Sequence, residues 1–292
     1  TTVLGTSATT AVGNSETGPE DMTFNADGTK MFVVGSTGNS VYEYSLSTAF
    51  DLSTSTAAGS LEIGDKETGV SSITFNADGS KMYVAGSAGD DINEFDMEND
   101  FNIIPDLQFG NLEGLTIDDS NNIVIVDKGD AEIIKVSQDE TILLNVTGFT
   151  APRDVAIDTS GNIYATEANS GNVTKLDSTG VQLWSIGGNG TADGKFDKPT
   201  GIDIDAAGNV YIADTGNNRL QKIDSDGTVL NTFDASDGDG LSNPTGLAIK
   251  DDGTIIVAES TGDQISEIQT TANFETSYGN STYGDFTVEA GP

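Results

Sequence analysis

The chain has 292 residues, with 47 Asp and Glu against 12 Lys and Arg, and a formal net charge of −35 at pH 7. A surface this acidic repels phosphate groups, and so few cationic side chains predict no binding to nucleic acid or to anionic lipid. The sequence contains no cysteine and no histidine, which excludes disulfides, Ser-His-Asp triads, and metal sites built from sulfur or imidazole.

The composition also bears on location. No stretch reaches the ~18 consecutive apolar residues that a membrane-spanning helix needs, so membrane insertion is not expected. A low lysine content with abundant Thr, Ser, Asn and Gly is typical of secreted and surface proteins, and Thr1 follows no charged leader in the printed chain. We therefore expect an extracellular or cell- or particle-surface protein from which any export signal has been removed.

Short apolar runs recur along the whole chain. Each has four to seven residues rich in Val, Ile, Phe and Tyr and follows a turn of Asp, Ser, Asn and Gly, which predicts a β-strand. The runs are KMFVVGS (30–36), KMYVAGS (81–87), NIVIVDK (122–128), NIYATEA (162–168), NVYIADT (209–215) and TIIVAES (254–260). They are versions of one strand, so the chain is a repeat array.

The spacing of the repeats predicts the fold. The apolar residue before each turn recurs at a mean interval of about 45 residues, which is typical of a propeller blade made of four antiparallel strands. The length fits six such blades in a single all-β domain, a six-bladed β-propeller with a surplus terminal strand. We expect repeats at 19–69, 70–110, 111–151, 152–198, 199–243 and 244–292, with 1–18 as a closing or exchanged strand.

The third to sixth repeats resemble a known family. PTGIDIDAAGNVYIADTGNNRLQKIDSDG (199–227) is very similar to the NHL repeat, and residues 152–180 and 244–268 resemble it too. The first two repeats are similar to tandem repeats of surface and tail-fibre-like proteins of marine bacteria and phages. The NHL resemblance implies a propeller, but NHL propellers serve as scaffolds, sensors, RNA-binding proteins and, in a few cases, enzymes. The RNA-binding branch uses basic surfaces, which this chain lacks.

Two terminal segments compete for one place in the ring. Residues 1–18 and residues 274–292 both resemble the fourth strand of a blade, yet a closed six-blade ring needs only one more. One end closes the ring while the other lies on the surface, or the spare end pairs with a neighbouring subunit in a head-to-tail polymer. A third possibility is that the chain is a fragment of a longer array, so that another blade follows Pro292.

Four acidic residues end the second strand of the NHL-like repeats, namely Asp127, Glu167, Asp214 and Glu259. Equivalent positions of a ring converge near one face, so these carboxylates are candidates for binding Ca²⁺, another cation or a polyhydroxyl ligand. The alternative is structural: each acid accepts hydrogen bonds from its own turn, and Arg219 pairs with Asp214 across the hairpin.

A second candidate site lies in the loop DASDGDGLS (234–242). It places Asp234, Asp237 and Asp239 on one Gly-broken segment, which resembles an oxygen-rich calcium loop without its full spacing. The alternative is an acidic, solvated loop. Beyond this possible Ca²⁺ no cofactor is expected, and the single tryptophan, Trp184, is expected to pack between blades rather than to bind sugar.

These observations leave three classes of function. No repeat carries a distinctive carboxylate pair, so a catalytic site is not expected, although lactonase-like propellers work with Glu, Asn and Asp around a divalent cation. A monomeric propeller could instead bind sugar, peptide or Ca²⁺ on one face. We favour a non-enzymatic subunit of a surface assembly or filament that associates with itself through its terminal strands.

Overall fold

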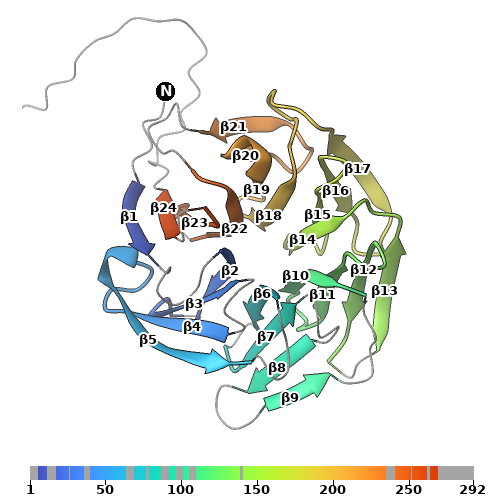
Figure 1. Ribbon diagram of the computed structural model, residues 1–292. Helices are drawn as coiled ribbons and strands as arrows, with labels where there is room; N and C mark the ends of the chain where they lie inside the picture. Colours follow the sequence, from blue (N-terminus) through green and yellow to red (C-terminus); the bar gives the residue numbers. More distant parts are fainter. Residues whose placement is uncertain are drawn as a thin grey trace, which may run out of the picture.

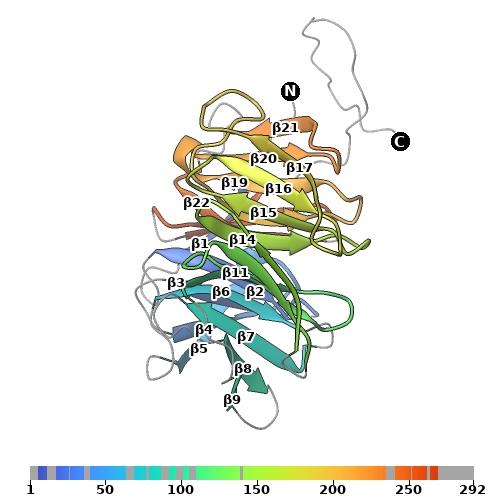
Figure 2. The same ribbon diagram turned by 90° about the vertical axis from the view of Figure 1, so that its right-hand side faces the viewer.

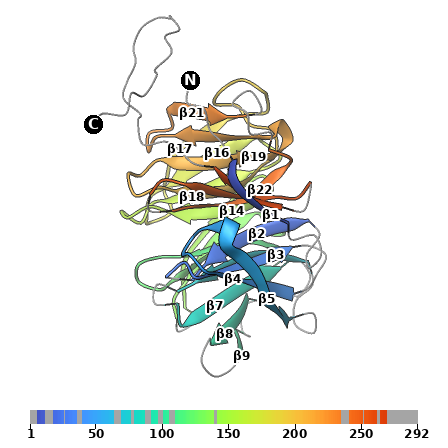
Figure 3. The ribbon, with the colours of Figure 1, turned by 90° about the vertical axis from the view of Figure 1, so that its left-hand side faces the viewer.

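The structure is a computed structural model that describes residues 6–11, 18–25, 27–35, 40–63, 69–76, 79–86, 92–96, 101–104, 110–138, 141–234, 241–250, 252–261 and 264–268. These residues form six four-stranded antiparallel sheets, arranged as blades around a central axis (Figure 1). Figures 2 and 3 show the same ring from two opposite sides. The expected six-bladed β-propeller is therefore confirmed. In the described part of the chain, no helix has both the length and the apolar character needed to cross a membrane.

In the first five blades the strands follow chain order from the axis outward (Figure 1). The first two blades comprise β2 (Pro19–Phe24), β3 (Lys30–Gly35), β4 (Ser40–Leu46) and β5 (Ser55–Glu62), then β6 (Val70–Phe75), β7 (Lys81–Gly86), β8 (Ile92–Asp96) and β9 (Phe101–Ile104). The next two comprise β10 (Leu112–Ile117), β11 (Ile123–Asp127), β12 (Glu132–Val136) and β13 (Ile142–Thr147), then β14 (Pro152–Ile157), β15 (Ile163–Glu167), β16 (Asn172–Leu176) and β17 (Gln182–Gly187). The fifth comprises β18 (Pro199–Ile204), β19 (Val210–Asp214), β20 (Arg219–Ile223) and β21 (Val229–Phe233), and the sixth β22 (Pro244–Ile249), β23 (Ile255–Glu259), β24 (Gln264–Ile268) and β1 (Thr6–Ala11). Two 3₁₀ turns, η1 (Leu52–Thr54) and η2 (Thr215–Asn217), complete the described elements.

Local sequence explains the first hairpin of the NHL-like blades. In the fifth blade the carboxylate of Asp205 accepts hydrogen bonds from the backbone N–H of Ala207 (3.0 Å) and of Asn209 (2.8 Å). Gly208 adopts a φ of +81°, a left-handed conformation that glycine takes without steric cost. The Asp side chain therefore replaces backbone partners in the turn and fixes the register of the two strands that follow. Asp118 and Asp158 make the same contacts in their own turns.

The N-terminal strand closes the ring. β1 pairs antiparallel with β24, with Thr10 opposite Ile265 and Ala11 opposite Gln264. It lies at the outer edge of the sixth blade, next to β24, the last strand of the described chain (Figures 1 and 3). Of the two roles considered for residues 1–18, the closing strand is the one found here. Residues 274–292 lie outside the described residues.

The core lies between the blades, and the innermost strands approach one another closely. A Cβ atom added to Gly201 would lie 2.2 Å from the carbonyl oxygen of Thr245 in the next blade, so only glycine fits there. Farther out, the ring of Trp184 packs edge-on against Tyr164, and its Nε1–H donates to the carbonyl oxygen of Ser225 in the neighbouring blade. The prediction that Trp184 packs between blades is therefore confirmed.

Candidate functional site

The four sequence-predicted acids lie at equivalent places and share one type of partner. Each ends the second strand of its blade, and their side chains are between 0 and 7% exposed. Each carboxylate accepts a backbone N–H from the loop that enters its own blade. The donors are Gly110 to Asp127 (2.6 Å), Thr150 to Glu167 (2.9 Å), Asp197 to Asp214 (2.7 Å) and Ser242 to Glu259 (2.5 Å).

The most elaborate of these contacts surrounds Asp214. Its carboxylate accepts hydrogen bonds from the Nε–H of Arg219 (2.7 Å) and from the side-chain amide of Gln221 (3.0 Å). Arg219 also donates to the carbonyl oxygens of Ala192 (3.0 Å) and Lys195 (2.9 Å) in the entry loop. The expected Arg219–Asp214 pair is therefore present, and these contacts are the ones that the structural interpretation requires. A ligand role for the four acids remains a prediction.

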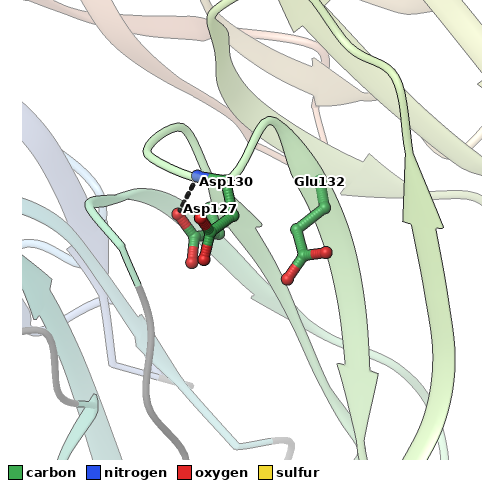
Figure 4. Close-up of side chains that lie close together, drawn as sticks. All are labelled: Asp127, Asp130 and Glu132. Carbon is green, nitrogen blue, oxygen red and sulfur yellow. Dashed lines mark hydrogen bonds between the residues drawn. The ribbon is translucent and has the colours of Figure 1, made fainter.

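One of the four acids belongs to a cluster that sequence reasoning missed. Asp127, Asp130 and Glu132 place a carboxylate oxygen each within 4.8 Å of one another on the hairpin between β11 and β12 (Figure 4). Three carboxylates can supply the oxygen ligands that Ca²⁺ prefers. Asp127, however, already accepts backbone N–H groups from Gly110, Asn111 and Asp130. The sequence signal was the run DKGDAE, which no other repeat shares.

The predicted calcium loop is described only in part. Asp234 is half-buried directly after β21, whereas Asp237 and Asp239 lie outside the described residues. A calcium site in this loop remains a prediction.

The structure brings three further carboxylates together on the axis of the ring. Asp21 of β2, Asp154 of β14 and Asp203 of β18 line a cavity of about 170 Å³ between the innermost strands, which we call the funnel. Each side chain bridges two blades by accepting a backbone N–H from the next blade. Asp21 accepts from Ile73 (2.9 Å), Asp154 from Ile202 (3.0 Å) and Asp203 from Ile249 (2.7 Å).

Burial controls the protonation of these three groups. Loss of solvation raises the pKa of Asp21 and of Asp203 from 3.8 to about 6, although hydrogen bonds from backbone N–H groups oppose the rise. Burial also raises the pKa of Asp154, and the negative charge of Asp21 adds to the effect. Three carboxyl groups therefore share a confined space in which each disfavours ionisation of the others.

The opposite mouth of the axis is narrower and has charges of both signs. A cavity of about 30 Å³ there is lined by Glu20, Glu113 and Arg153 together with the shared Asp21 and Asp154. Arg153 donates to the carboxylate of Glu113 (3.0 Å), which also pairs with Lys128. Both cations are thus engaged with the same glutamate. Sequence reasoning missed the axial acids because they occupy two different register positions and form no motif.

Comparison with known proteins places one repeat in a family. Residues 196–223 match the model of the NHL repeat. The ring is an NHL-repeat-like propeller. The match includes β18, β19 and β20, and with them Asp214 and Arg219. A search of curated proteins found no match.

Several solved structures share the architecture at low sequence identity. A streptogramin B lyase is 14% identical, covers 91% of this chain and 97% of its own, and superposes with a TM-score of 0.65. A catalytically inactive histidine-to-alanine variant of virginiamycin B lyase from Staphylococcus aureus with quinupristin is also 14% identical, with coverage of 91% and 99% and a TM-score of 0.67. The WD40 β-propeller domain of Doa1 is 12% identical, with coverage of 93% and 99% and a TM-score of 0.62. At these identities the similarity establishes the fold alone.

Proposed function

We propose that the chain is a non-enzymatic extracellular interaction protein, an acidic propeller subunit of a surface assembly or filament whose copies are joined by exchange of a terminal strand. The observation that carries this proposal is the closure of the ring by β1. The sixth blade has one place for an outer strand beside β24, and β1 occupies it. The sequence offers two segments with the character of an outer strand, 1–18 and 274–292. The segment left over is available to a neighbouring copy, and head-to-tail contacts that do not close produce fibres.

The chemistry of the described acids supports a non-enzymatic role. Asp127, Glu167, Asp214 and Glu259 hold the loops that enter their own blades, so their oxygens are already engaged. The structurally similar virginiamycin B lyase is catalytically inactive as a histidine-to-alanine variant, and this chain contains no histidine. The reaction of that lyase is therefore a poor guide to this propeller.

Electron microscopy of negatively stained protein, combined with light scattering at increasing protein concentration, tests the assembly. Each measurement is made with calcium and again with a chelator. We expect filaments or short chains of rings whose repeat is close to one propeller diameter, and a mass that rises with concentration. Single rings of monomer mass under both conditions would contradict the proposal.

A monomeric ligand-binding propeller is the second candidate, and the funnel favours it. Asp21, Asp154 and Asp203 give this cavity a high density of carboxyl oxygens, which suits a cation such as Ca²⁺. Titration of the protein with CaCl₂ in a calorimeter, with MgCl₂ as the control for unspecific screening, tests it. Saturable binding of one Ca²⁺ by single rings, abolished by Asp21→Ser, supports this candidate. Absence of saturable heat at millimolar CaCl₂ contradicts it for calcium.

A further inference from the structure

In the last three blades, a side chain of the third strand holds the acid at the end of the second strand. Thr174 donates to the carboxylate of Glu167 (2.6 Å) in the fourth blade, and Ser266 donates to that of Glu259 in the sixth. All four of these residues are buried. The third strand therefore supplies a buried donor for each buried carboxylate.

The fifth blade shows what an amide needs at this position. The side-chain nitrogen of Gln221 donates to the carboxylate of Asp214 (3.0 Å) and to the carbonyl oxygen of Lys195 (2.7 Å). Its side-chain oxygen accepts the backbone N–H of Gly194 (2.8 Å). A carboxylate and an N–H group thus satisfy the two ends of the buried amide.

The second blade keeps an amide at this position and lacks the acid. Asn93 lies opposite Val84 in the β7–β8 pair, the register that Gln221 has in the fifth blade. Two positions after Val84, β7 ends at Gly86, whereas β19 ends at Asp214. Gly86 therefore stands where each of the last four blades holds a carboxylate.

The amide of Asn93 is buried and unsatisfied. The residue is 1% exposed, and within the described part of the chain neither Nδ2 nor Oδ1 has a hydrogen-bond partner. Its neighbours on this face of the blade are apolar, since Val84 and Phe95 belong to the core between the first two blades. Burying a carboxamide without partners costs free energy, and native proteins satisfy most such groups. The unsatisfied amide therefore indicates a place for a further molecule.

The first blade shows that loss of the acid alone does not create such a place. Its second strand also ends in glycine, Gly35. The residue in register with Asn93 is Tyr42, however, which is only partly buried. Among the described residues, the second blade is the one that combines the missing acid with a buried, unsatisfied amide.

We propose that the second blade binds the carboxylate of a small ligand in the place of the missing acid, with Nδ2 of Asn93 as the donor. By analogy with Gln221, the ligand also offers an N–H group to Oδ1 of Asn93. An N-acylated amino acid carries this pair of groups side by side. The ligand is small because Asn93 lies among core side chains. This inference goes beyond the proposed assembly and does not depend on it.

Thermal unfolding of the full-length chain with N-acetylglycine as the probe tests the site. We expect a saturable rise in melting temperature, and at roughly ten times the dissociation constant the equilibrium constant of unfolding should fall about 11-fold. N-acetylglycinamide, which keeps the N–H group and lacks the carboxylate, is the matched control and should have no such effect. Absence of a saturable effect of N-acetylglycine at tens of millimolar, or an equal effect of the two compounds, overturns the inference.

The charge of the chain provides a second signature. A net charge of −35 opposes the entry of an anionic ligand. Salt screens this repulsion, so N-acetylglycine should bind more tightly at physiological than at low ionic strength. A site that held the carboxylate by an ion pair would show the opposite trend, and that result would contradict the assignment to Asn93.

Substitution of Asn93 separates a binding role from a structural one. Asn93→Leu replaces the amide by an apolar side chain of similar size and should abolish the effect of the probe. Without the probe it should unfold no more easily than the parent, because no hydrogen bond is lost. Thr174→Val, which removes the donor to Glu167, should be less stable than the parent. A clear loss of stability in Asn93→Leu without the probe would mean that the chain already satisfies the amide, and would overturn the inference.

Supplying the acid from the chain itself gives an independent readout. Gly86→Asp places a carboxylate beside Asn93 and should raise the melting temperature and remove the effect of the probe. Gly35→Asp places the same acid in the first blade, away from Asn93, and should leave the effect of the probe intact. Equal responses of these two variants to N-acetylglycine overturn the assignment to the second blade. If Gly86→Asp does not fold, the response of Asn93→Leu decides the question.

Discussion

Replacing Asp21 by serine should change how the stability of the propeller depends on pH. Asp21 bridges the first two blades from the axis, where it faces the carboxyl groups of Asp154 and Asp203. Serine is compatible with this place, because Ser72 holds the equivalent position in the second blade and accepts the N–H of Leu115 (3.2 Å) in the third. The substitution therefore removes a charge and keeps an acceptor.

The magnitude follows from the pKa of Asp21, which rises from 3.8 to about 6 on folding because of burial. The folded state binds the proton of the Asp21 carboxyl group more strongly than the unfolded state does. The stability that this protonation contributes is therefore complete below pH 3.8 and is lost as the pH rises through about 6. One pKa unit corresponds to about 1.4 kcal/mol, which gives a loss of roughly 3 kcal/mol, of which about 2 kcal/mol falls between pH 4.5 and 7.5. The Asp21→Ser variant lacks this loss of stability. Because the charge of Asp21 is gone, ionisation of Asp154 and Asp203 also becomes easier.

Urea unfolding at constant ionic strength, from pH 4.5 to 7.5, measures the effect. The turn acids Asp118 and Asp158 have lowered pKa values, so they oppose the trend, but they are common to both proteins. The free energy of unfolding of Asp21→Ser minus that of the parent should therefore rise by about 2 kcal/mol or more across this range. Ser72→Ala removes the hydroxyl that donates to the carboxylate of Asp21 (2.9 Å) and lowers its pKa, so the free energy of unfolding of this variant minus that of the parent should fall as the pH rises. A flat difference for Asp21→Ser would refute the reasoning.

Four further outcomes are expected. Arg219→Met leaves the buried carboxylate of Asp214 without its cationic partner and should lower the free energy of unfolding by about 3 kcal/mol or more. Arg219→Lys should lower it by less than Arg219→Met does, and a loss below about 1 kcal/mol for Arg219→Met in urea unfolding contradicts this prediction. Gly201→Ala places a Cβ 2.2 Å from a carbonyl oxygen and should cost roughly 1–3 kcal/mol, whereas Gly59→Ala, with no atom within 4 Å, should be neutral. Thr245→Val removes the hydroxyl that donates to the carbonyl oxygen of Pro19 (2.8 Å) and joins the last blade to the first, so a cost of about 1 kcal/mol is expected in the same assay. Added NaCl or CaCl₂ should raise the melting temperature of a chain with a charge of −35, and a constant value from low to high ionic strength would contradict the role of self-repulsion.

The features predicted correctly from sequence are those with a local cause. The strand repeats and their turns depend on residues close together in the chain, as in the turn where Asp205 accepts the N–H of Asn209. The position of Asp214 at a strand end and its pairing with Arg219 are local for the same reason. Counting such units gave the number of blades.

The axial acids could not be predicted in the same way. Asp21 and Asp154 share a register position with Ser72 and Gly114, so the sequence shows no consistent residue type there. They meet only because the closed ring brings six innermost strands together. That β1 closes the ring is also invisible locally, because its partner strand β24 lies at the other end of the described chain.

The pairing of β1 with β24 has a consequence for synthesis of the protein. Thr6 and Ile268 lie about 260 residues apart, so β1 leaves the ribosome long before its partner strand exists. At roughly 5–20 residues per second, the delay is on the order of 10–50 s. Throughout that time the nascent ring is open, and non-local pairing of this kind is the slowest class of folding event. Ring closure therefore cannot precede the synthesis of β24, and in the interval before it β1 of one nascent chain can meet β24 of another.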